Sequence, residues 1–147
     1  MKIMDFTILV VEDDPDHVLL LQMAFRKAHL ANPVKFVRDG EEAIDYLSGS
    51  GAYGDRKRFP VPSLVLLDLK LPKKSGLEVL EWMRQVPALA AVPVIILTSS
   101  SEPADRAAAQ RLGVESYLVK PVGFEGLLEI VKSLGMYWMV LSKAPGA

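Results

Sequence analysis

Cysteine is absent from the 147-residue chain. This absence excludes disulfide bonds, thiolate metal sites and a cysteine nucleophile, and it suits a reducing compartment. The chain also lacks any apolar run of the roughly 18 to 20 residues that a membrane-spanning helix needs. The start MKIMDFTILVVEDD has one short apolar run that ends in three acids, without the small-residue cleavage site of a signal peptide. We therefore expect a cytoplasmic protein with no membrane partner.

An excess of charge of one sign is missing as well. The 17 basic and 18 acidic residues give a net charge of -1, so no overall field would recruit nucleic acid. Half of the residues are apolar and 24% are charged, which is an ordinary balance for a globular protein. Because one core is commonly built from about 100 to 200 residues, we expect a single domain over residues 1–147.

Five short apolar runs, most of them rich in β-branched residues, predict β-strands. They lie at residues 7–11, 34–37, 64–67, 94–97 and 116–119. The third and fourth runs, LVLL and VIIL, are continuous rather than alternating. Continuous runs are typical of parallel strands that are covered on both faces, so these two strands should be central.

Segments with helical spacing follow each predicted strand. We expect helices at 15–30, 40–47, 77–84, 104–112 and from 123 to about 141. Strands that alternate with helices indicate right-handed crossovers and a parallel sheet between two helix layers. The predicted fold is therefore α/β, flavodoxin-like and doubly wound, a (βα)5 unit with strand order 2-1-3-4-5. The one long loop, residues 48–62, should be exposed.

Polar side chains stand at the ends of four of the five predicted strands. They are Glu12, Asp13 and Asp14 after the first strand, Asp68 after the third, Thr98 after the fourth and Lys120 after the fifth. In this topology the carboxyl ends of strands one and three meet at the functional crevice. Carboxylates gathered there repel one another unless a cation intervenes, and Mg²⁺ prefers such oxygen ligands. Metal, hydroxyl and ammonium together suit a phosphoryl group, and Asp68 is a candidate nucleophile.

Taken in order, these motifs resemble the receiver domains of two-component response regulators. The segments that carry the resemblance are ILVVEDDP, RDGEEAIDYL, LVLLDLKLPKKSGLEVL, VPVIILTSS and GVESYLVKPV. Asp68 is followed four residues later by Pro72 and eight residues later by Gly76, as in that family. The resemblance implies a receiver core at about 5–135, a helical extension and tail at about 136–147, and no output domain.

The resemblance also implies a phosphoacceptor and a metal site. Asp68 would accept the phosphoryl group from a sensor histidine kinase. Mg²⁺ would be bound directly by Asp13, by Asp68 and by the backbone carbonyl of Lys70, and Glu12 would reach it through a water. Mn²⁺ or Ca²⁺ could replace Mg²⁺ in a crystal. Asp14, a third consecutive acid, is a candidate either for this site or for the cap of the first helix.

Further roles follow from the same resemblance. Thr98 would donate a hydrogen bond to the phosphoryl group and Lys120 would pair with it. Tyr117 would act with Thr98 as a switch whose ring turns inward, and the peptide bond before Pro121 would be cis. Such a protein is a signalling receiver that catalyses only its own phosphotransfer and autodephosphorylation, rather than an enzyme with a separate substrate.

A narrower resemblance concerns the loop GAYGDRKRFPVP, the segment LDLKLPKKSG and the last helix. These are similar to single-domain regulators that partner bacterial and cyanobacterial phytochromes. They imply a phytochrome as the kinase and a homodimer formed through the last helix. The dimer candidates are Met136, Tyr137, Trp138 and Leu141. The alternative is that these residues cover the sheet of their own domain.

Two other functions compete with this interpretation. An aspartyl-phosphate phosphatase also uses Asp, Thr, Lys and Mg²⁺, but generally carries a second Asp two residues after its nucleophile, where this chain has Lys70. A phosphorylation-independent dimeric scaffold would not need the acidic pair, Thr98 and Lys120. Lys70 and Ser100 stand at positions that influence phosphate lifetime in the family, and a lysine there could stabilise charge or obstruct water.

Overall fold

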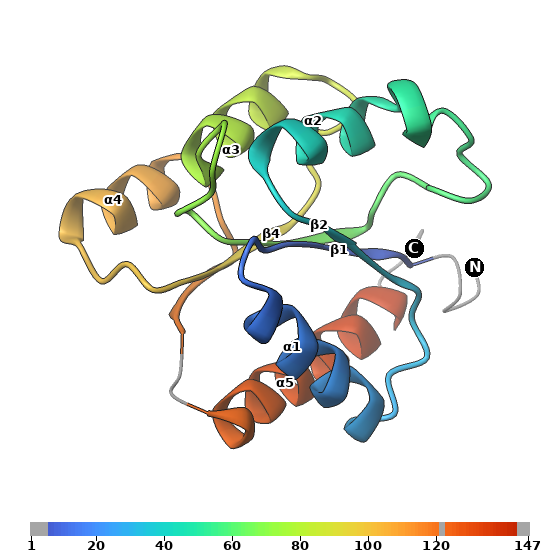
Figure 1. Ribbon diagram of the computed structural model, residues 1–147, viewed down its shortest axis with the longest axis vertical. Coiled ribbons are helices and arrows are strands. Elements are labelled where there is room, and N and C mark those ends of the chain that lie inside the picture. The colour runs from blue at the N-terminus through green and yellow to red at the C-terminus, as the bar shows by residue number, and fades with distance from the viewer. Residues whose placement is uncertain (1–5, 121–122, 144–147) are drawn as a thin grey trace.

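A parallel five-stranded sheet lies at the centre of the protein (Figure 1). The computed structural model describes residues 6–120 and 123–143, with side chains as far as Leu134. The strands are β1 (Ile8–Val11), β2 (Val34–Val37), β3 (Leu64–Leu67), β4 (Val94–Thr98) and β5 (Ser116–Val119). Their order is β2-β1-β3-β4-β5 and every pair is parallel. The predicted fold and strand order are confirmed.

Helices cover both faces of the sheet. The helices α1 (Pro15–Lys27) and α5 (Phe124–Lys143) lie on one face, and α2 (Gly40–Ser48), α3 (Gly76–Gln85) and α4 (Pro103–Arg111) lie on the other (Figure 1). Every strand is followed by one helix, as the alternating pattern predicted. The loops at the carboxyl ends of the strands therefore gather at one edge of the sheet.

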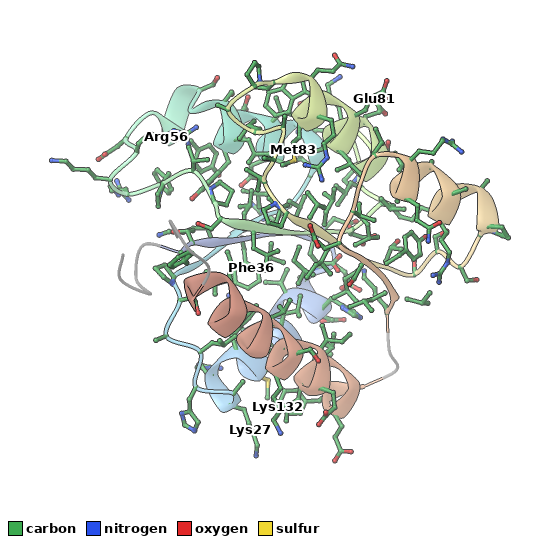
Figure 2. All side chains as sticks on the ribbon, turned by 180° about the vertical axis from the view of Figure 1, so that it is seen from behind. Lys27, Phe36, Arg56, Glu81, Met83 and Lys132 are labelled. Atoms are coloured by element: carbon green, nitrogen blue, oxygen red, sulfur yellow. The ribbon has the colours of Figure 1, made fainter. Side chains whose placement is uncertain are left out.

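Two hydrophobic cores explain why the central strands are continuously apolar. Strands β1, β3 and β4 are buried along their whole length. In β3, Val65 and Leu67 face the core under α2, α3 and α4, whereas Leu64 and Leu66 face the core under α1 and α5. Figure 2 shows Met83 and Phe36 on opposite sides of the sheet, one in each layer. Because both faces are covered, the strands that carry the polar residues have little freedom to shift.

The first helix begins as predicted but ends three residues early. The side chain of Asp14 accepts a hydrogen bond from the backbone N–H of Asp16, so Asp14 caps α1. The helix ends at Lys27 rather than at Leu30, because His29 takes a left-handed conformation with φ of 55°. This turn reverses the chain toward β2. The apolar residue Leu30 packs on the core from outside the helix.

The long loop between α2 and β3 is anchored more firmly than its composition suggests. It contains a short 3₁₀ helix, Gly51–Tyr53, and the side chain of Arg56 turns back onto α2 (Figure 2). The guanidinium donates hydrogen bonds to the carbonyl oxygens of Tyr46 at 2.6 Å, Leu47 at 2.7 Å and Phe59 at 3.1 Å. Since the last carbonyls of a helix have no partner within it, Arg56 caps the carboxyl end of α2.

Several predicted features lie outside the described residues. Pro121, with its expected cis peptide bond, falls in the gap after β5. The backbone of α5 continues to Lys143, but the dimer candidates Met136, Tyr137, Trp138 and Leu141 stand beyond the last described side chain. These features stay predictions. Among the helices described, none combines the length and apolar character required to cross a bilayer.

Replacing Arg56 with Ala should lower the free energy of unfolding by about 2 kcal/mol, because carbonyl oxygens at the end of α2 would lose a charged donor. Chemical denaturation measured by circular dichroism checks this. Lys57→Ala is the matched control, since Lys57 is an exposed neighbour on the same loop, and its replacement should change stability by less than about 0.5 kcal/mol. Equal stability of the two variants would contradict the capping role.

Candidate functional site

Strand register places two carboxylates side by side. Val11 of β1 lies opposite Leu67 of β3, and the backbone N–H of Asp68 donates to the carbonyl oxygen of Val11 at 3.1 Å. The residues that follow this pair, Glu12 and Asp68, therefore stand next to each other at the edge of the sheet. Both are almost fully buried, with 2% and 3% of their surfaces exposed. A buried carboxylate is costly unless a positive charge accompanies it.

The ammonium of Lys120 supplies that positive charge. Its Nζ lies 2.7 Å from Oε1 of Glu12 and 2.8 Å from Oδ2 of Asp68, so one lysine bridges both acids. Lys120 follows β5, and its backbone N–H donates to the carbonyl oxygen of Thr98 at 2.7 Å. The side chain is 12% exposed. Three strand ends thus meet in one ion-paired cluster.

This cluster carries more negative than positive charge. Glu12, Asp13 and Asp68 each offer a carboxylate oxygen, and these oxygens lie within 4.8 Å of one another. Three carboxylates and the one ammonium of Lys120 sum to -2. A divalent cation would neutralise that charge, and the hard oxygen donors suit Mg²⁺ or Mn²⁺. Asp13 is the exposed member of the group and opens the cluster to solvent.

Burial and pairing act in opposite directions on the ionisation of the cluster. Burial raises the pKa of Glu12 above its usual value, although the hydrogen bond from Lys120 and the backbone N–H of Asp14 oppose that rise. For Lys120, burial lowers the pKa, but hydrogen bonds to Asp68 and Glu12 outweigh burial and hold the pKa above its usual value. The lysine is therefore charged at neutral pH and compensates the two acids.

The loop after β3 fixes the second oxygen of Asp68. Oδ1 accepts the backbone N–H of Lys70 at 3.0 Å, while Oδ2 pairs with Lys120. Gly76 begins α3 directly against this loop. A Cβ at Gly76 would stand 2.1 Å from the carbonyl oxygen of Asp68, so no larger residue fits there without moving the backbone. The carboxylate of Asp68 is thus oriented from two sides.

Thr98 and Tyr117 lie near each other but are connected through a third residue. Thr98 is fully buried at the end of β4, and its Oγ1 accepts the backbone N–H of Ser100 at 3.3 Å. The hydroxyl of Tyr117 donates to the carbonyl oxygen of Ser100 at 2.9 Å, and the ring is 9% exposed. The guanidinium of Arg106 stands 4.7 Å from the centre of that ring. The ring of Tyr117 is therefore turned inward here.

Sequence reasoning missed the neighbours of these residues. His17 lies in the first turn of α1, and its Nδ1 lies 3.8 Å from Oε1 of Glu12. Burial, followed by the charge of Lys120, lowers the pKa of His17. The ammonium of Lys70 lies 3.2 Å from Oδ2 of Asp105 on α4. Both contacts depend on side chains that α1 and α4 bring to the edge of the sheet. The spacing of residues within one segment of the sequence does not predict such contacts.

Comparison with known sequences gives one family for nearly the whole chain. The model of the response regulator receiver domain matches residues 8–132. A probable methanogenesis regulatory protein, FilR2 of Methanothrix harundinacea, is 38% identical over 96% of this chain and 88% of its own length. The response regulator Rcp1 of Synechocystis is 35% identical over 95% of this chain and 93% of its own length.

Solved structures agree with the sequence comparison. The crystal structure of the phosphorylated cyanobacterial phytochrome response regulator RcpA superposes with a TM-score of 0.85, at 35% identity, over 96% of this chain and 99% of that one. The Mn²⁺-bound form of Rcp1 superposes with a TM-score of 0.81 over 90% of this chain and 94% of that one, again at 35% identity. Glu12, Asp13 and Asp68 form an acidic cluster that could hold a metal ion, and the similar Rcp1 has been crystallised in a Mn²⁺-bound form.

Replacing Lys120 with Met should lower the free energy of unfolding by about 3 kcal/mol at neutral pH, because two buried carboxylates would lose their shared cation. Urea denaturation measures the change. Lys132→Met is the matched control, since Lys132 makes an exposed pair with Glu129 and should contribute less than about 1 kcal/mol. If both variants were equally stable, the bridge would not be holding the cluster together.

Millimolar Mg²⁺ should raise the midpoint of thermal unfolding, since a ligand of the folded state adds about 2.7 kcal/mol at 100 times its dissociation constant. Asp13→Asn should lose most of the rise, because the exposed carboxylate of the cluster is removed. Asp16→Asn, an exposed acid outside the cluster, should keep it. Differential scanning fluorimetry with and without Mg²⁺ tests this, and the same shift in both variants would exclude a metal site at Asp13.

Proposed function

Because this chain belongs to the response regulator receiver family, we propose that it receives a phosphoryl group on Asp68 from a sensor histidine kinase. Receiver domains are signalling modules rather than classical enzymes. The observation that carries the proposal is the position of the Asp68 carboxylate. It is buried between β1 and β4, oriented by the N–H of Lys70 and paired with Lys120, at the edge where the acids converge.

The cation in this proposal is Mg²⁺. Asp13, Asp68 and the backbone carbonyl of Lys70 would bind it directly, and Glu12 through a water. The donor set supports this, because all of these ligands are hard oxygens and the cluster carries a net charge of -2. When bound, Mg²⁺ neutralises the charge that the phosphoryl group brings to the carboxylates. Mn²⁺ would fit the same ligands.

Phosphoryl transfer requires the protein to form one covalent bond, at Asp68. A carboxylate oxygen of Asp68 forms a bond to phosphorus as the phosphorus–nitrogen bond of the kinase phosphohistidine breaks, and the histidine leaves with its electron pair. Lys120 then pairs with a phosphoryl oxygen instead of with Oδ2 alone. The hydroxyl of Thr98 donates to another oxygen, and Tyr117 follows Thr98 as the switch. Phosphorylation can shift this switch only by as much as the phosphoryl group favours one position.

The proposed input is a phytochrome kinase, and the proposed output is contact with another protein. Rcp1 and RcpA support this input, because RcpA is a phytochrome response regulator and both match over nearly the whole chain. We propose one receiver domain over residues 1–147 that acts in the cytoplasm and forms a homodimer through the end of α5, with Met136, Tyr137, Trp138 and Leu141 at the interface. The net charge of -1 favours protein contacts over nucleic acid.

A phosphatase that hydrolyses separate phosphate esters fits the site less well. Such an enzyme needs a second acid beside its nucleophile to protonate the leaving group. Two residues after Asp68 stands Lys70, and its ammonium is paired with Asp105 on α4. Of the acids in the cluster, Glu12 is already paired with Lys120. The arrangement therefore suits a single modification of Asp68 rather than repeated turnover.

Incubation with acetyl phosphate and Mg²⁺ should add one phosphoryl group to the wild type, as detected by intact-mass spectrometry. Asp68→Asn should gain none, and removal of Mg²⁺ should abolish the gain. Asp45→Asn, an exposed acid on α2, is the control and should be phosphorylated like the wild type. Phosphorylation of Asp68→Asn, or rapid release of phosphate from many esters without an adduct, would contradict the proposal.

A further inference from the structure

The ammonium of Lys70 pairs with Asp105 rather than with the neighbouring Asp68. Its backbone N–H donates to Oδ1 of Asp68, so its own backbone is within hydrogen-bond distance of the proposed phosphoacceptor. Its ammonium instead lies 3.2 Å from Oδ2 of Asp105, in the first turn of α4. About half of the Lys70 side chain is exposed, whereas Asp68, two residues earlier, is buried. Lys70 is therefore an exposed neighbour of the buried Asp68.

Asp105 is fixed by a second contact. The hydroxyl of Ser100 donates to the same Oδ2 atom at 2.5 Å, from the loop between β4 and α4. The hydrogen bond from Ser100, followed by the nearby Lys70, holds the pKa of Asp105 below its usual value. Asp105 is thus charged at neutral pH, and the hydroxyl of Ser100 gives its carboxylate a partner besides Lys70.

The pair between Lys70 and Asp105 is one that a stronger anion can break. Both partners are near the surface, and an exposed ion pair contributes little to stability. A phosphoryl group on Asp68 would bring about two negative charges, compared with the one of Asp105, into the neighbourhood of the same flexible side chain. The ammonium of Lys70 can then pair either with Asp105 or with the phosphoryl oxygens.

We propose that Asp105 is a positioning residue that holds Lys70 away from Asp68 and thereby shortens the lifetime of the phosphoryl group. This inference rests on the proposed function, since it concerns the fate of the phosphorylated Asp68. The carboxylate of Asp105 on α4 would thus control the loss of the phosphoryl group from Asp68, at the end of β3.

The step that Lys70 controls is hydrolysis of the acyl phosphate. A water oxygen forms a bond to phosphorus, the bond from phosphorus to the Asp68 oxygen breaks, and Asp68 leaves as a carboxylate while the protons of the water stay with phosphate and solvent. Water must reach the phosphorus from the exposed side. Since the exposed side chain of Lys70 begins two residues from Asp68, an ammonium bound to the phosphoryl oxygens would obstruct that approach, and Asp105 would keep the approach open by retaining the ammonium.

A double-mutant cycle tests this coupling. The protein is phosphorylated with acetyl phosphate and Mg²⁺, the donor is removed by desalting, and the loss of the phosphoryl group is followed by intact-mass spectrometry. Asp105→Asn should prolong the half-life severalfold, because the amide oxygen can still accept the hydroxyl of Ser100 but no longer attracts Lys70. In a Lys70→Met background the same Asp105 substitution should change nothing. Such a cycle isolates an effect that passes through Lys70.

Asp105→Glu is the conservative control and should restore a half-life near that of the wild type, because its carboxylate can still retain Lys70. An unchanged half-life in Asp105→Asn would overturn the inference. So would an equal change with Lys70 and with Met at position 70, because Asp105 would then act through the structure of α4 alone. A wild type that gains no phosphoryl group at all would overturn the proposed function first, and this inference with it, so the two failures are distinct.

Discussion

The ammonium of Lys120, held between Glu12 and Asp68, is the interaction on which the rest of the site depends. Parallel pairing of β1 and β3 forces two carboxylates together in a place where water cannot solvate them. Lys120, which follows β5, compensates the charge of both carboxylates. The third acid of the cluster, Asp13, is exposed to solvent. In the proposed function, the same excess of negative charge would attract a divalent cation and, with it, a phosphoryl group. The stability of the cluster and the proposed function therefore depend on the same electrostatic balance.

Close backbone packing around Asp68 fixes the geometry of the charged cluster. The loop after Asp68 is held at both ends by glycines that allow close approach. Gly76 lets α3 begin against the carbonyl oxygen of Asp68, and Gly40 lets α2 begin against Lys74, whose carbonyl oxygen would stand 2.0 Å from a Cβ there. Beyond the loop, Asp105 connects Lys70 with Ser100, and Ser100 connects with Tyr117. A change of charge at Asp68 thus has contiguous contacts through which it can reach α4 and β5.

Much of this architecture could be predicted from the sequence because it follows from local patterns. Continuous apolar runs predicted the central strands, and the residues at their ends predicted the acidic edge with Lys120. Contacts between distant segments could not be predicted in this way. The role of Arg56 depends on where its guanidinium meets the end of α2, and the pair of Lys70 with Asp105 depends on how α4 packs beside the loop after β3. The early end of α1 reflects a single left-handed residue, His29, which helical spacing does not reveal.

The residue that would carry the phosphoryl group, Asp68, can be identified chemically. An acyl phosphate, unlike a free carboxylate, is reduced by borohydride to an alcohol, so an aspartyl phosphate becomes homoserine. Reduction of the acetyl phosphate-treated protein, followed by proteolysis and tandem mass spectrometry, locates the modified residue directly. We expect homoserine at position 68 and at no other acid of the cluster. Homoserine at position 13, or a phosphoryl group found only on His17, would contradict it.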